Sequence, residues 1–64
     1  MKPKELKRLA QRIASLELII EQNEDHEKVR KAQNEIMELS GKIKNPDDLF
    51  QIDELVQEIL EKNS

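Results

Sequence analysis

The chain has 64 residues, a net charge of −3 and no cysteine. A chain of this length forms one domain at most, and it buries only about 60% of the surface that its unfolded form exposes. Without cysteine, neither a disulfide nor a cysteine-ligated zinc can reinforce the fold. We therefore expect a single domain over residues 1–64, whose own stability is marginal.

The composition favours helices over strands. Strands are enriched in β-branched and aromatic residues, but the sequence has no threonine, tyrosine or tryptophan, and Phe50 is its only aromatic residue. Glutamate, lysine, leucine, isoleucine and glutamine dominate instead, and most of these are good helix formers. The sequence therefore predicts an all-α fold.

The first helix is expected over about residues 3–22. Pro3 suits the first turn, where its missing N–H costs nothing. Apolar residues then recur at steps of three and four, which places them on one helix face: Leu6, Leu9, Ile13, Leu16 and Ile20. A second row beside this seam holds Ala10, Ala14 and Leu18. Two adjacent rows let a helix contact two neighbours, and alanines allow close approach.

The second helix is expected over about residues 24–43, with Asn23 or Asp25 as its cap. Its apolar seam has the same spacing as that of the first helix: Val29, Ala32, Ile36, Leu39 and Ile43. Gly41 leaves the end of this helix open. A glycine often terminates a helix in the left-handed conformation, yet Ile43 continues the seam beyond it.

The third helix is expected over about residues 46–62 and has the clearest start. Asn45 reads as the cap and Pro46 as the first helical residue, and two acids follow in the first turn. Apolar residues cover one broad face of this helix: Leu49, Ile52, Leu55, Val56, Ile59 and Leu60.

Short connections between amphipathic helices favour antiparallel neighbours. The sequence thus predicts a small three-helix bundle with up-down-up topology. The alternative is a helical hairpin whose third helix packs in a homodimer, because narrow heptad seams are also typical of coiled coils.

Charge is distributed unevenly along the chain. Five bases (Lys2, Lys4, Lys7, Arg8 and Arg12) crowd the first twelve residues, whereas six acids and a single base follow Asn45. Parallel first and third helices would bring these opposite charges together. The basic start, including Arg8 and Arg12, is otherwise a candidate surface for an acidic partner. A nucleic acid is the weaker choice, since stacking aromatics are absent and the net charge is acidic.

The residue types argue against an enzyme. His26 is the only histidine, and no carboxylate occupies the neighbouring positions on its own helix face, so we predict a solvated side chain and no metal site. Gly41 is the only glycine, which excludes a glycine-rich phosphate loop. Abundant carboxylates such as Glu54 and Glu58 suit a solvated helix face. We expect no cofactor.

Three apolar residues lie off the predicted seams: Ile19, Met37 and Phe50. Aromatic residues are favoured anchors at protein interfaces. We therefore predict a non-enzymatic protein-binding module, such as an adaptor, regulator or chaperone-like protein, with partner contacts at Phe50, Ile19, Met37, Arg8 and Arg12. A homo-oligomeric structural bundle is the alternative. No apolar run approaches the roughly 20 residues of a membrane span, and we expect a cytoplasmic protein.

Overall fold

The computed structural model describes residues 2–62 and shows three α-helices: α1 (Pro3–Gln22), α2 (His26–Gly41) and α3 (Pro46–Lys62). No strand occurs within these residues. The predicted all-α three-helix bundle is confirmed. Residues 1, 63 and 64 of the expected domain lie outside the described part of the chain. No helix within residues 2–62 is long and apolar enough to cross a membrane.

The helix boundaries follow from local hydrogen bonds. Asp25 caps α2, because its carboxylate Oδ1 accepts a hydrogen bond from the backbone N–H of Glu27 at 3.0 Å. Asn45 similarly accepts one from the backbone N–H of Asp47 at 2.9 Å. Such side-chain caps satisfy N–H groups that have no partner inside the helix. The predicted start of the third helix is thus confirmed.

The second helix begins two residues later than predicted, and the sequence left its end open between Gly41 and Ile43. It begins only after the Asp25 cap, and it ends at Gly41. Gly41 does not adopt the left-handed conformation, since no residue in the described chain has a positive φ angle of that kind. Instead the backbone N–H groups of Lys42 and Ile43 bond to carbonyls three residues back, which tightens the last turn. Ile43 is therefore buried in the core although it lies outside the helix.

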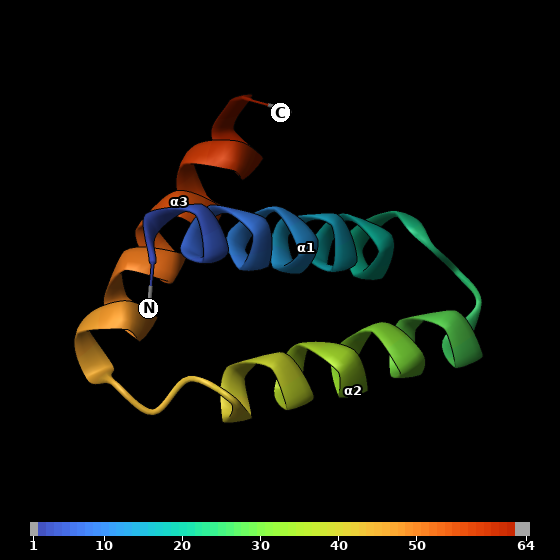
Figure 1. Ribbon diagram of the computed structural model, residues 1–64. Coiled ribbons are helices and arrows are strands. Elements are labelled where there is room, and N and C mark those ends of the chain that lie inside the picture. The colour runs from blue at the N-terminus through green and yellow to red at the C-terminus, as the bar shows by residue number, and fades with distance from the viewer. Residues whose placement is uncertain (1, 63–64) are drawn as a thin grey trace.

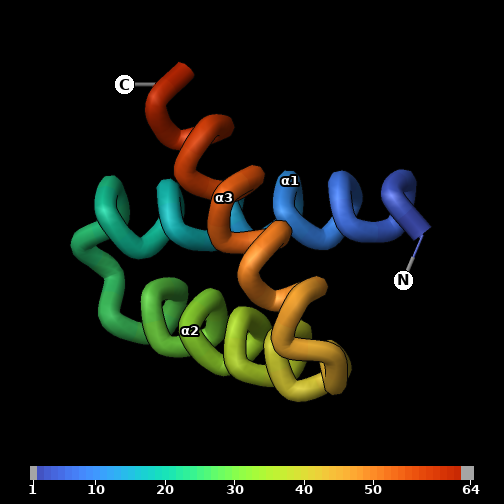
Figure 2. The backbone as a smooth tube through the Cα atoms, turned by 90° about the vertical axis from the view of Figure 1, so that its left-hand side faces the viewer, coloured from blue at the N-terminus to red at the C-terminus, as the bar shows by residue number. Residues whose placement is uncertain are grey.

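Helix α1 is the centre of the molecule (Figures 1 and 2). It packs extensively against both α2 and α3, whereas contacts between α2 and α3 are few. Figure 1 shows α1 and α2 running in nearly opposite directions, joined by a short loop. The buried core cluster comes from α1, α3 and the segment after α2: Leu6, Ala10, Ile13, Ala14, Ile43, Ile52 and Val56. Both apolar rows predicted on the first helix contribute to this cluster, Leu6 and Ile13 from one row and Ala10 and Ala14 from the other.

Helix α3 crosses α1 obliquely and does not run alongside it (Figure 2). Two rows of residues at a spacing of four, one on each helix, share the buried cluster at this crossing. Ala10 and Ala14 on α1 are completely buried or nearly so, at 0% and 1% exposure, and Ile52 and Val56 on α3 are also buried. When rows of this spacing interdigitate, helices prefer to cross at about 50°. The small alanine side chains let α3 approach α1 closely at this crossing.

Candidate functional site

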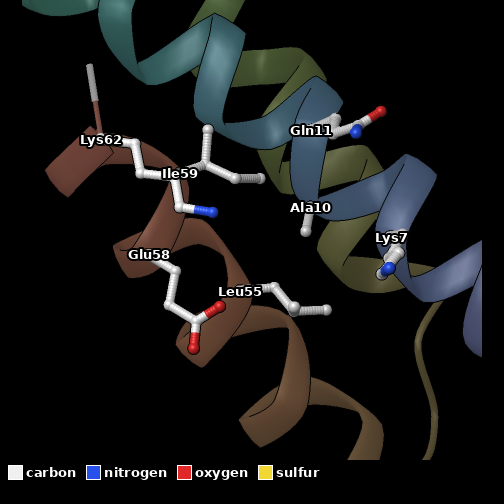
Figure 3. A pocket seen from close by; sticks show the side chains of 7 residues that line it. All are labelled: Lys7, Ala10, Gln11, Leu55, Glu58, Ile59 and Lys62. Atoms are coloured by element: carbon white, nitrogen blue, oxygen red, sulfur yellow. The ribbon is translucent and has the colours of Figure 1, made fainter.

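The oblique crossing leaves hollows on the surface where the helices diverge. The first is the α1–α3 wedge, which opens between the N-terminal half of α1 and the C-terminal half of α3 (Figure 3). Its lining is Lys7, Ala10, Gln11, Leu55, Glu58, Ile59 and Lys62. Leu55 and Ile59 are half-buried and also pack against the core. Lysines and a glutamate share its rim, so the wedge favours neither a cationic nor an anionic ligand.

The second hollow is the basic groove between α1 and α2. Its lining is Leu16, Ile19, Asn23, Lys28, Lys31, Ala32 and Glu35. Leu16 and Ala32 are buried and form its floor, while Ile19 is 38% exposed. The structure therefore places the predicted contact residue Ile19 beside two lysines of α2.

Arg12 is joined to α2 at the edge of this groove. Its Nε lies 2.6 Å from Oε2 of Glu35, and its Nη2 lies 3.1 Å from Oε1, so the two groups form a bidentate pair. Hydrogen bonding from Arg12 holds the pKa of the Glu35 carboxyl below its ordinary value of 4.5, and the same contact raises the pKa of Arg12. Both side chains remain largely accessible to solvent, so the contribution to stability is small.

The Arg12–Glu35 pair should make stability depend on pH in the acid range. Because the folded state lowers the pKa of Glu35, the pair stabilises the protein above about pH 4.5 and is lost as the pH falls below that value. We expect Glu35→Gln to melt at a slightly lower temperature than wild type at neutral pH, and the difference to vanish in acid. Thermal melts from neutral to acid pH measure this. Exposed Glu38→Gln is the charge-matched control, and an equal pH dependence in both variants would contradict the assignment.

The third hollow is the acidic notch. It lies beside the C-terminal half of α1, where α2 and α3 separate from each other. Its lining is Glu17, Ile20, Glu21, Ile36, Gln57 and Leu60. Ile20, Ile36 and Leu60 come from the three different helices, and each is half-buried. Two glutamates of α1 stand at its rim. Sequence reasoning missed this site, because its residues belong to the ordinary apolar seams and meet only through the crossing of α3.

Phe50 lies on a fourth surface, formed by α3 alone. This Phe50 surface comprises Phe50, Asp53, Glu54, Gln57 and Glu58. Phe50 is 66% exposed. Gln57 also lines the acidic notch, so the two surfaces adjoin.

The predicted contact residues do not form one patch. Ile19 lines the basic groove together with Glu35 of α2, and Glu35 is also the ion-pair partner of Arg12. The groove therefore relates Ile19 to Arg12. Phe50 lies on α3, and the hollow that it lines is formed by α3 residues alone. Met37 is 71% exposed on α2, and Arg8 is exposed on α1. Their role in binding stays a prediction.

No group of three histidine, aspartate or glutamate side chains within residues 2–62 is arranged to hold a metal ion. His26 occupies the first position of α2 and is exposed to solvent, as expected for a solvated helix start. Comparison of the chain with family models, curated proteins and solved structures gives no match.

Proposed function

We propose that this chain is a small protein-binding module whose primary anchor is Phe50. The observation that carries the proposal is the 66% exposure of the only aromatic side chain in the sequence. Aromatic residues are enriched among the side chains that dominate binding energy at protein interfaces. Burial of this ring against a partner would remove a large apolar area from water.

The surroundings of Phe50 favour a specific contact over a purely apolar one. Asp53 and Glu54 flank the ring on the same face of α3. Charged groups around an apolar anchor steer the approach of an oppositely charged partner and fix its orientation. The Phe50 surface, the basic groove and the acidic notch are open to solvent, which suits docking of a protein surface better than enclosure of a small substrate. We assign the chain no catalytic step.

Affinity capture with a Phe50→Ala variant tests the proposal. Proteins captured by wild type should be depleted with Phe50→Ala, while Gln51→Ala, one exposed position further along α3, should retain them. Once a partner is identified, we expect Phe50→Ala to weaken binding by at least about 30-fold, as for an interface anchor worth about 2 kcal/mol. An unchanged capture profile would remove Phe50 as the anchor.

Self-association is measured in the same series. Light scattering over a range of concentrations shows whether wild type forms oligomers, and whether Phe50→Ala reduces them. If the oligomer forms and depends on Phe50, the partner is a second copy of the chain. If wild type stays monomeric at all concentrations, the homo-oligomeric alternative is excluded and a different protein is required.

A further inference from the structure

We infer that the acidic notch is a docking site for a basic amphipathic helix of a partner protein. The inference rests on the proposed protein-binding function but concerns a different surface and the chemistry of the partner. It starts from the shape of the notch, in which Ile20, Ile36 and Leu60 form an apolar floor supplied by three helices. An apolar groove between helices is the usual receptor for the apolar face of another helix.

The floor is only partly covered by the chain itself. Helix α3 crosses α1 and then diverges from α2, with which it makes few contacts. The three apolar floor residues therefore remain half-buried. A fourth helix that inserted its apolar side chains here would complete the burial that the oblique crossing prevents.

The charged residues around the notch indicate which sign of charge a partner must carry. Glu17 and Glu21 stand on its rim. Residues 13–22 of α1 and the loop 23–25 contain acids but no lysine or arginine. The only base of α3, Lys62, lines the α1–α3 wedge instead. On α2, the helix neighbours of Ile36 one turn away are uncharged. The notch therefore attracts cationic side chains and repels an acidic helix.

The neighbouring hollows do not offer the same combination. The basic groove carries Lys28 and Lys31, which would repel a cationic helix. The α1–α3 wedge has lysines on its rim beside Glu58. The Phe50 surface is acidic, but it belongs to a single helix and supplies no apolar floor. It adjoins the notch through Gln57, so one bound helix can contact both surfaces.

The experiment uses a synthetic basic amphipathic peptide of about 18 residues, long enough for five helical turns. Leucines occupy one face of the peptide and lysines the other. Titration into the isotope-labelled protein at low salt should shift the backbone amide resonances most strongly at Glu17, Ile20, Glu21, Ile36 and Leu60. The same peptide with glutamine in place of lysine should bind more weakly.

Matched charge variants establish the site. Glu17→Gln with Glu21→Gln should weaken peptide binding roughly three- to tenfold, as expected for the loss of two rim charges. Glu5→Gln with Glu38→Gln removes the same charge from exposed positions outside the four hollows, and should leave binding within about twofold of wild type. Thermal melts of both variants check that the fold is retained.

The possible outcomes distinguish failure of the notch as a docking site from failure of the proposed function. Equal weakening by both charge pairs, or resonance shifts away from the notch, overturns the notch as the site. Loss of peptide binding in Phe50→Ala but not in the rim variant also overturns it and leaves Phe50 as the anchor. If wild type instead self-associates through the notch, the occupant is a second copy and the inference of a separate basic helix is wrong.

Discussion

Replacement of Ile52 by alanine is expected to destabilise the protein by about 2–5 kcal/mol, the cost of deleting a large aliphatic side chain from a core. Ile52 is only 2% exposed and lies in the core cluster where α3 crosses α1. Natural domains have roughly 0.05–0.15 kcal/mol of stability per residue. In a chain of 64 residues, this loss is a large part of the total.

Urea denaturation followed by circular dichroism measures the effect of Ile52→Ala. We expect the midpoint to fall markedly, with the variant partly unfolded even without denaturant. Gln51→Ala, at the adjacent exposed position, is the control and should stay close to wild type. Equal stability of the two variants would mean that α3 does not pack on α1 through this face.

Enlargement of Ala14 to leucine is expected to cost about 1–3 kcal/mol, because the crossing of α1 and α3 has no room for a longer side chain. Ala14 is 1% exposed and belongs to the cluster that includes Ile52 and Val56. The substitution lowers intrinsic helix propensity only slightly, since leucine ranks just below alanine. A loss of stability larger than this small difference in propensity therefore reports the close approach of the helices.

Ser15→Leu provides the matched control for Ala14→Leu. The position is one residue along the same helix and exposed, so the added side chain meets solvent and not α3. Thermal melts should show a clear decrease for Ala14→Leu and little change for Ser15→Leu. If both variants melted like wild type, the alanines would not be the point of close contact.

The sequence alone was sufficient to predict the three helices and many of the buried residues. Seam residues such as Leu6 and Ile13 are buried as predicted, and Asn45 caps α3 as predicted. These features depend on local hydrogen bonds and on periodicity, both of which are visible in a single sequence. The burial of Ile43 followed from the seam, although the helix itself stops at Gly41.

The arrangement of the surfaces required the structure. Periodicity identifies the apolar face of a helix but not the angle at which a neighbour crosses it. Ala10 and Ala14 indicated close approach, but they did not indicate which helix would approach. The acidic notch depends on that crossing, because Ile20, Ile36 and Leu60 meet only when α3 diverges from α2. The exposure of Phe50, by contrast, followed from its position off the seam.

The crossing of α3 over α1 also links two hollows on opposite flanks of the same helix. Leu55 and Ile59 of α3 face the α1–α3 wedge, whereas Gln57 and Leu60 face the acidic notch. Because α3 lines both hollows, a substitution at the alanine contact that displaces α3 from α1 would change the shape of both hollows at once.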